Sequence, residues 1–179
     1  MDEIKELKLN LGCGTDLKEG YVNVDIADLP GINVKHDLNK FPYPFEANSV
    51  DEIYMDHVIG HLESPTNFLR ECHRILKEGK KIIIKEPHFT SATAYWGEIR
   101  KWQFSHITLK RYEKGSKRSY YFDFGFSKVN IKFDFQKTPV LFFFYNYLIE
   151  SIANKWPYAY EMTPLQAFPC RQMIIEFIK

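Results

Sequence analysis

Short strand-like segments, the first of which alternates between apolar and polar residues, run through the first third of the chain. Residues 7–11 (LKLNL) alternate in this way and lead into Gly12, and residues 21–26, 34–38 and 50–55 are further short segments with the character of strands. A period of two is typical of a strand with one buried face. We therefore predict four strands here, the first of which ends in a tight glycine turn.

The period changes between Ser64 and Glu78, where the pattern predicts a helix. Ser64 suits the N-cap, Pro65 suits the first turn, and Gly79 is expected to end the helix. The expected apolar face of this helix consists of Phe68, Leu69, Cys72, Ile75 and Leu76. The β-branched run that follows, KKIIIKEP, is typical of a strand buried in a parallel sheet. Strand, helix and strand in succession predict an α/β fold.

The second half of the chain has a less regular pattern. Residues 126–135 alternate cleanly and predict a strand, and residues 172–178 predict a last strand that would add an antiparallel edge to the sheet. Helices are expected at 140–154 and within 97–114. Because no repeat or low-complexity linker divides the sequence, we expect residues 1–179 to form a single domain.

Composition agrees with an ordinary globular domain. The 179 residues are 45% apolar and 26% charged, which excludes a disordered chain, a collagen and a coiled coil. The longest apolar stretch, 139–149, is too short to cross a bilayer, and the charged start MDEIKELK does not resemble a signal peptide. Three widely spaced cysteines make neither a disulfide framework nor a zinc knuckle, so we expect a cytoplasmic protein.

Charge and aromatic residues divide the chain into two halves. Residues 1–88 carry 11 Lys/Arg and 16 Asp/Glu, a net charge of −5, whereas residues 89–179 carry 13 and 7, a net charge of +6. Six of the 29 aromatic residues lie in the first half and 23 in the second. We expect 1–88 to bind a cofactor and 89–179 to bind or cover the substrate. The alternative is that the second half has an aromatic core.

Four sites whose residues could bind a ligand follow four successive predicted strands. In order, they are Gly12-Cys13-Gly14, Asp25, Asp37-Leu38 and Asp56-His57. Ligands of open α/β sheets bind beyond the carboxyl ends of the strands. Glycines there let the backbone approach a ligand, Asp25 can accept both hydroxyls of a ribose, and Asp37 with Leu38 suits an adenine. Taken singly, each position also fits a tight turn, a solvated carboxylate or an Asp–Asn turn.

His57 and His61 are spaced to share one face of a helix. Such a pair can bind a metal ion, but no third ligand stands in a convincing register. We therefore expect no metal, with His57 lining a cofactor pocket and His61 packed and hydrogen-bonded.

Residues 7–88 together resemble the class I S-adenosylmethionine-dependent methyltransferases. LNLGCG looks like the first motif of that family, VNVDI its acidic second strand and HDL its adenine-binding turn. FPYPFEANSVDEIYMDHVIGHL is similar to its fourth strand and the helix after it, and FLRECHRILKEGKKIIIKEP to the next helix and fifth strand. The resemblance implies a Rossmann-like, mostly parallel sheet of about seven strands with an antiparallel last strand and helices on both faces.

The resemblance also implies roles for individual residues. Gly12, Cys13 and Gly14 would pass under the methionine and ribose parts of S-adenosylmethionine, and Asp25 would hold the ribose hydroxyls. Asp37 and Leu38 would contact adenine. Asp56 and His57 would lie near the sulfonium and the incoming acceptor.

The connection after the first strand is shorter than the family usually has. Seven residues, 15–21, separate Gly14 from the second strand, whereas a parallel crossover generally needs a dozen or more. A subgroup of the family with a shortened first connection looks similar. The short loop counts against a dinucleotide, whose pyrophosphate needs a helix N-terminus beneath it. Lys18 and the amides around Thr15 and Asp16 are candidates to hold the cofactor carboxylate.

Methyl transfer is mostly a matter of positioning, and a hydroxyl acceptor also benefits from a general base. His88, in KEPHF, and His106, in QFSHIT, are the candidate catalytic residues. The motifs of adenine-amine and cytosine-C5 methyltransferases are absent after the fourth strand. We therefore expect a small-molecule acceptor, with a sugar or glycan hydroxyl as one candidate.

Two alternatives remain open from the sequence. Residues 100–118 hold seven Lys or Arg, which suits an RNA methyltransferase as well as a solvated basic face. A non-catalytic module that binds S-adenosylmethionine would share the features of the first half.

Overall fold

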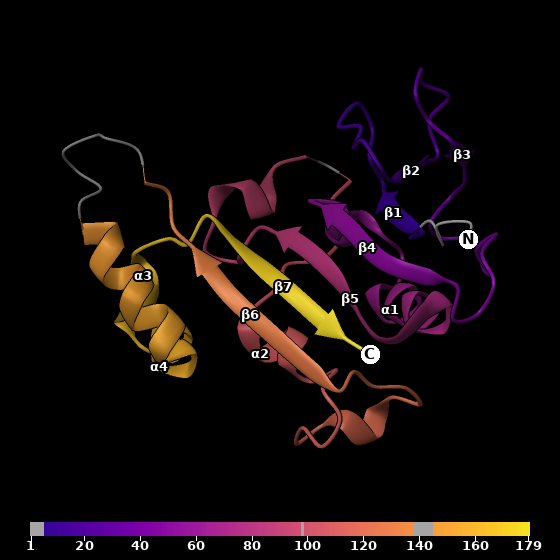
Figure 1. Cartoon of the computed structure of the whole chain (residues 1–179). Coiled ribbons are helices and arrows are strands. Elements are labelled where there is room, and N and C mark those ends of the chain that lie inside the picture. The colour runs from indigo at the N-terminus through magenta and orange to yellow at the C-terminus, as the bar shows by residue number, and fades with distance from the viewer. Residues whose placement is uncertain (1–5, 98, 138–144) are drawn as a thin grey trace.

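A seven-stranded mixed sheet organises the chain (Figure 1), and the computed structural model describes residues 6–97, 99–137 and 145–179. The strands are β1 (Lys8–Leu11), β2 (Val22–Asp25), β3 (Val34–Lys35), β4 (Val50–Asp56), β5 (Leu76–Glu86), β6 (Lys128–Asp134) and β7 (Gln172–Ile178). Their order is β3-β2-β1-β4-β5-β7-β6, and β7 runs antiparallel to both of its neighbours, β5 and β6. The predicted mostly parallel sheet with an antiparallel last strand is confirmed.

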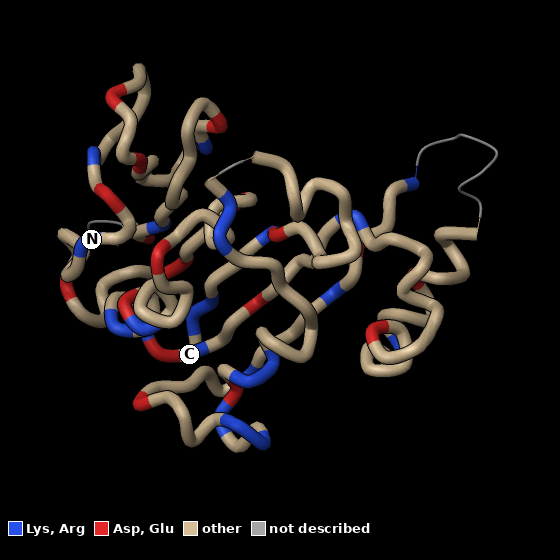
Figure 2. Tube along the Cα trace, turned by 180° about the vertical axis from the view of Figure 1, so that it is seen from behind, with Lys and Arg blue, Asp and Glu red and all other residues tan. Residues whose placement is uncertain are grey.

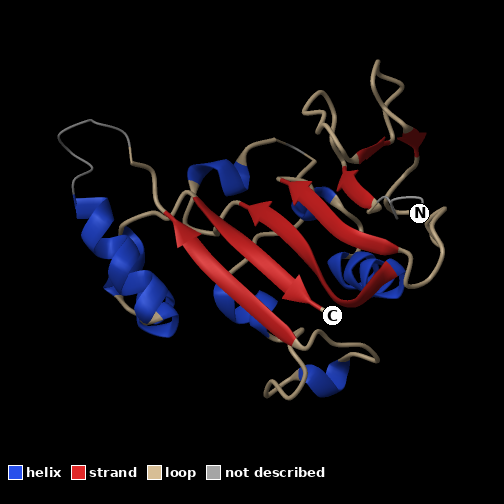
Figure 3. Ribbon diagram, viewed as in Figure 1, coloured by secondary structure: helices blue, strands red, loops and turns tan. Residues whose placement is uncertain are grey.

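The helices lie on one face of this sheet and along one edge (Figure 3). They are α1 (Pro65–Ile75), α2 (His106–Lys110), α3 (Tyr145–Lys155) and α4 (Pro157–Met162). In Figure 3, α1 and α2 lie behind the strands, whereas α3 and α4 lie beside the outer edge of β6. We expected helices on both faces; the described connections before β3 carry none, so the front face in this view lacks that cover.

Helix α1 begins as predicted and ends earlier. The Ser64 side chain accepts a hydrogen bond from the amide of Asn67 at 3.2 Å, and Pro65 is the first helical residue. The helix stops at Ile75 because Leu76 is already extended and pairs with Val50 of β4. The prediction that Gly79 ends the helix is wrong. Gly79 lies inside β5 with φ +73°, in an irregular stretch where the register shifts.

Other element boundaries also differ from expectation. Strand β3 has two residues, and in the described part of 97–114 the α-helix is limited to α2, which opens with a capping box at Ser105. Of the helix expected at 140–154, the described part is α3; residues 140–144 lie outside the described residues.

The core between α1, α2 and the sheet is aromatic in its second half. From β1, β4 and β5, aliphatic side chains such as Leu9 and Ile53 are buried completely. Near β6 and β7, aromatic side chains make up much of the core. The fully buried aromatic residues there include Phe126, Phe133, Phe135, Tyr160 and Phe177. Much of the aromatic excess after residue 89 is therefore core packing.

The cap of α1 gives a test of this local fold. Replacing Ser64 by Ala leaves the Asn67 amide without its acceptor and should lower the free energy of unfolding by about 1 kcal/mol. Urea denaturation measures the change. The matched control, Ser64→Asp, keeps a capping oxygen and should lose much less; equal losses in both variants would contradict the capping role.

Candidate cofactor site

A cavity of about 210 Å³ lies at the edge of the sheet where the first four strands end. Its lining consists of Gly12, Asp25, Ile26, His36, Asp37, Leu38, Asn39, Val58, His61 and Leu62. Four of these residues, Gly12, Asp25, Asp37 and Leu38, were predicted from the sequence. The others belong to the turns that follow the same strands; of these, only His61 was singled out from the sequence, and it was expected to be packed and hydrogen-bonded rather than to line a cofactor cavity.

The turn after β1 brings the backbone close to the cavity. Gly12 has φ +67°, and its amide donates to the carbonyl oxygen of Val24 at 2.8 Å. A Cβ at this position would lie 2.6 Å from Cγ1 of Val58, so a larger residue would displace the cavity wall. Cys13 is buried beside the turn and does not line the cavity, and burial raises the pKa of its thiol.

Asp25 is held at the cavity by backbone amides. Gly14 donates to Oδ2 at 2.8 Å, and Ala27 donates to Oδ1 at 2.9 Å. Each carboxylate oxygen keeps a further lone pair, so both oxygens can still accept a hydrogen bond from a diol. The turn at Gly14 thus orients the predicted ribose-binding carboxylate.

Asp37 and Leu38 form the far wall of the cavity. Oδ1 of Asp37 accepts the amide of Asn39 at 3.0 Å, so the predicted cofactor residue also makes the Asp–Asn turn that was its alternative. Leu38 is buried and lines the same cavity. The aliphatic side chains of Ile26, Leu38, Val58 and Leu62 leave apolar surface beside two carboxylates. This combination fits the ring and the diol of an adenosine.

Two buried asparagines hold the short connection between β1 and β2. Nδ2 of Asn10 donates to Oδ1 of Asn23 at 2.9 Å and also contacts the carbonyl oxygen of Asp16 at 2.8 Å. The amide of Lys18 donates to the same Oδ1 at 2.9 Å. Side-chain amides therefore satisfy backbone groups that a crossover helix would otherwise satisfy. The ammonium of Lys18 lies 4.0 Å from the centroid of the Tyr54 ring and not among the cavity residues.

Comparison with known proteins agrees with this geometry. Residues 10–84 match a family model described as a methyltransferase domain. Residues 10–84 are thus similar to the class I S-adenosylmethionine-dependent methyltransferases, and the sheet of the whole chain has the Rossmann-like fold of these enzymes. The match to this family model indicates methyl transfer from S-adenosylmethionine. A search of curated proteins found no match.

Several solved methyltransferases share the fold. A SAM dependent methyltransferase from Archaeoglobus fulgidus is 19% identical with a TM-score of 0.63, and the alignment covers 98% of this chain and 87% of that one. A possible histamine N-methyltransferase from Thermotoga maritima is 15% identical with a TM-score of 0.57, covering 99% and 84%. Phosphoethanolamine N-methyltransferase 2 of Haemonchus contortus, solved with S-adenosylmethionine, is 13% identical with a TM-score of 0.55, covering 99% and 50%.

Asp56 and His57 of the methyltransferase lie just beyond this cavity. Oδ2 of Asp56 accepts the hydroxyl of Tyr54 at 2.7 Å and lies 3.4 Å from the ammonium of Lys85. His57 has φ +57°, and its Nε2 lies 3.0 Å from Oε1 of Gln172 at the start of β7. His57 therefore faces the second half of the chain, and it is His61 that lines the cofactor cavity.

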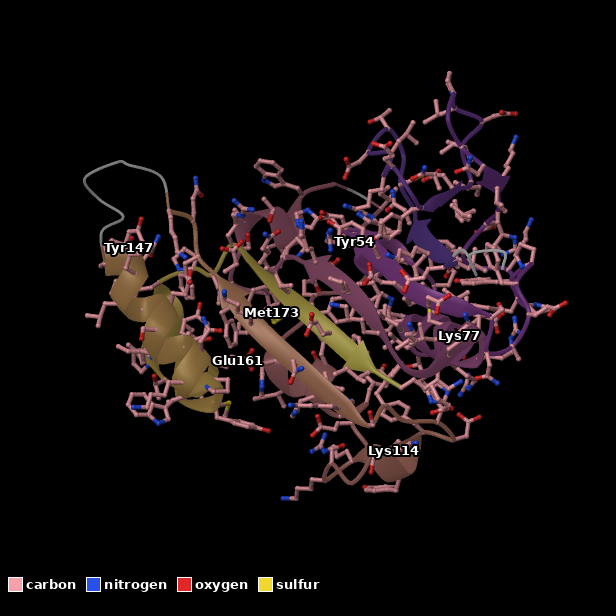
Figure 4. All side chains as sticks on the ribbon, in the orientation of Figure 1. Tyr54, Lys77, Lys114, Tyr147, Glu161 and Met173 are labelled. Atoms are coloured by element: carbon pink, nitrogen blue, oxygen red, sulfur yellow. The ribbon has the colours of Figure 1, made fainter. Side chains whose placement is uncertain are left out.

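The two predicted catalytic histidines are buried. His88 is 0% exposed, with Nδ1 2.8 Å from Oγ1 of Thr90 and Nε2 3.0 Å from Oε1 of Glu161. Figure 4 shows Glu161 on α4, beside the sheet. Burial lowers the pKa of His106, whose Nδ1 has no hydrogen bond within the described residues. Neither ring lines the cofactor cavity, and their catalytic role stays a prediction.

A buried ion pair fixes the turn that carries Val58, His61 and Leu62. Nη1 of Arg100 contacts Oε1 of Glu86, and both side chains are at most 5% exposed. Burial raises the pKa of Glu86 to about 7, although Arg100 opposes the shift. The amides of Lys101 and Trp102 both donate to the carbonyl oxygen of Gly60, at 2.8 and 3.1 Å. The turn is therefore held by residues that follow β5.

The surroundings of His61 favour its neutral form. Burial, together with the nearby charge of Arg100, lowers the pKa of its imidazole. Its Nδ1 has no hydrogen-bond partner in the described part of the chain. No group of three metal-binding side chains occurs among the described residues, and no described helix is long and apolar enough to cross a membrane.

Cofactor binding tests the role of Asp25. Replacing Asp25 by Ala should weaken binding of S-adenosylmethionine and S-adenosylhomocysteine by about ten-fold or more, the scale of a lost charged hydrogen bond. Calorimetric titration measures the dissociation constants of both ligands. Asp28→Ala is the matched control, because Asp28 is an exposed carboxylate three residues on that pairs with Lys35. An unchanged affinity in Asp25→Ala, or an equal loss in the control, would remove the assignment.

Gly60 gives a second test. A Cβ there would lie 2.7 Å from Oε1 of Glu86 and closer still to Arg100. Gly60→Ala should therefore lower the free energy of unfolding by about 1–3 kcal/mol. It should also weaken cofactor binding, because it displaces the turn that bears His61. Thermal unfolding and calorimetry measure the two effects, and full stability in the variant would show that the turn does not depend on this packing.

Proposed function

We propose that this methyltransferase acts on a small molecule bearing a hydroxyl group, of the sugar or glycan kind. A second cavity, of about 410 Å³, supports this acceptor class. Its lining consists of Ser91, Ala92, Thr93, Trp96, Gln136, Tyr145, Asn146, Pro169, Cys170 and Arg171. These residues follow β5 and β6, precede β7 or open α3. Because β7 is antiparallel, its start meets the ends of β5 and β6 at the same sheet edge as the cofactor cavity.

The chemistry of the second cavity suits a polar ring. The hydroxyls of Ser91 and Thr93 lie 2.8 Å apart, and Arg171 supplies a guanidinium. Asn146 is buried, and its Oδ1 has no hydrogen bond within the described residues. That orphaned acceptor carries the proposal, because a ligand hydroxyl is the partner that would satisfy it. Trp96, 70% exposed, adds a flat apolar platform.

The two cavities support the expected division of the chain. The cofactor cavity is lined within residues 12–62 and the second cavity within 91–171. When bound, S-adenosylmethionine supplies an activated methyl group, so the protein's part is to hold the acceptor in line with it. Asp25, Asp37 and Leu38 would hold the cofactor, and residues 91–96 and Asn146 would orient the acceptor.

A panel of sugars and other hydroxyl-bearing small molecules tests this function, with release of S-adenosylhomocysteine as the readout. We expect turnover of at least one member and a rise in its KM of about ten-fold in Trp96→Ala, the scale of one lost aromatic contact. Trp156→Ala, which removes another exposed tryptophan outside the cavity, should leave KM unchanged. Turnover of amines alone would overturn the hydroxyl acceptor.

An RNA acceptor is the second candidate, and one observation favours it. Lys110, Arg111, Lys117 and Arg118 surround a cavity of about 270 Å³, and the last three make no ion pair among the described residues. Figure 2 shows this concentration of basic residues low in the view. However, the loop lies at the start of β6, opposite the edge with the cofactor cavity, as Lys114 marks in Figure 4.

Salt dependence separates the two candidates. RNA gripped by this loop should bind more weakly as salt rises, and the binding should disappear when Arg111, Lys117 and Arg118 are replaced by Ala. We expect weak or no RNA binding and unchanged turnover of the small-molecule acceptor in that variant. Methylation of RNA that the triple substitution abolishes would instead establish the second candidate.

A further inference from the structure

A chain of three side chains crosses the sheet edge between the two cavities. Nε2 of Gln172 donates to Oδ2 of Asp134 at 2.7 Å, and Oε1 of Gln172 lies 3.0 Å from Nε2 of His57. Asp134 ends β6, Gln172 begins β7 and His57 follows β4, so the chain joins residues from three strands. It links the turn beside the cofactor cavity to the strands around the second cavity.

This chain fixes the tautomer of His57. The Asp134 carboxylate can only accept, so Gln172 must turn its NH₂ group toward it. Oε1 of Gln172 then faces His57 as an acceptor, and Nε2 of the imidazole carries the proton. Nδ1 is left with its lone pair. It has no hydrogen bond within the described residues, and the side chain is 42% exposed.

The other candidate bases lack this combination. Both ring nitrogens of His88 are engaged by Thr90 and Glu161 in a fully buried setting. His106 is buried among rings that include Phe133 and Tyr158. His57 is the one of the three that is both exposed and provided with a free, oriented lone pair. Its left-handed backbone (φ +57°) is a conformation that non-glycine residues seldom adopt without a structural or functional reason.

We propose that Nδ1 of His57 is the proton acceptor for the methylated hydroxyl, with Gln172 and Asp134 as positioning residues. The inference rests on the proposed hydroxyl acceptor. Methyl transfer forms an oxygen–carbon bond, while the electrons of the broken sulfur–carbon bond remain on sulfur. The acceptor oxygen then has to release its proton, and Nδ1 takes it as the ring becomes an imidazolium whose two N–H groups face the acceptor and Gln172.

The charges around His57 are compatible with a proton acceptor. Oδ1 of Asp56 lies 3.7 Å from Nε2, and Asp134 stands behind Gln172, so two carboxylates lie on the Nε2 side of the ring. Arg100, whose Nη2 lies 3.5 Å from the carbonyl oxygen of His57, brings a positive charge to the same turn. Further charged or titratable groups nearby are Lys85 and Tyr54, which contact Asp56; Glu86, paired with Arg100; Arg171, 3.7 Å from Asp134; and His61, whose pKa is lowered by burial.

The test uses the full chain with three variants. His57→Asn removes the base with a residue that tolerates a left-handed backbone. Gln172→Leu breaks the chain, and Asp134→Asn replaces its acceptor-only end by an amide, so that Gln172 can turn either way; both leave the imidazole. His73→Asn is a control for loss of a histidine elsewhere in the fold. The measurements are calorimetric binding of S-adenosylmethionine, nitrogen NMR of the imidazoles, and the pH dependence of kcat with the acceptor found on the hydroxyl panel.

The proposal expects a specific set of results. The wild-type His57 should carry its proton on Nε2, and Gln172→Leu should give a mixture of tautomers. His57→Asn should lower kcat by roughly 100-fold or more and remove the rise of rate near neutral pH, while cofactor affinity stays unchanged. Gln172→Leu and Asp134→Asn should lower kcat by a smaller factor and leave KM nearly constant, and His73→Asn should keep the wild-type profile.

The outcomes distinguish this proposal from the function on which it rests. Turnover of a hydroxyl acceptor with an unchanged pH profile in His57→Asn would overturn the role of His57 and leave the proposed function standing. A wild-type proton on Nδ1 would overturn it even without an acceptor. Absence of any hydroxyl turnover, with normal cofactor binding, would contradict the proposed function itself.

Discussion

The buried ion pair between Glu86 and Arg100 is the interaction on which the sheet edge with the cofactor cavity depends. It joins the end of β5 to the segment before α2, and that segment holds the turn after β4 through the carbonyl of Gly60. Removing one partner would leave an uncompensated charge in a site from which water is excluded, at a cost of about 3–5 kcal/mol. The cofactor cavity in the first half of the chain is thus shaped by a residue from the second half.

A second constraint is the missing crossover helix between β1 and β2. Parallel neighbours normally need such a connection, yet here ten residues join the two strands without one. The amides of Asn10 and Asn23 take its place by bonding the loop backbone and each other. Because this arrangement needs no helix on that face, it also explains why the sheet front is open there. Asp25 still reaches the cavity, since the turn at Gly14 orients it directly.

Local patterns predicted the parts of the fold that local physics decides. Ser64 caps its helix, and Asp25, Asp37 and Leu38 reach one cavity because they follow parallel strands. The shift of register within β5 left no local trace, so Gly79 was assigned to a helix end. The bonds from Glu86 to Arg100 and from His57 to Gln172 depend on how strands pair across the sheet. His57 and Gln172 are 115 positions apart, a pairing that a single sequence does not reveal.

These long-range contacts converge on one residue. The carbonyl oxygen of His57 faces Arg100, its amide donates to Lys85 of β5, and its ring meets Gln172 of β7. Backbone and side chain are thus held from opposite sides, which sustains a left-handed conformation that costs about 1–3 kcal/mol elsewhere. Methyl transfer requires two bound molecules in a fixed relative geometry. A residue anchored to both halves of the chain is where that geometry can be maintained as either cavity fills.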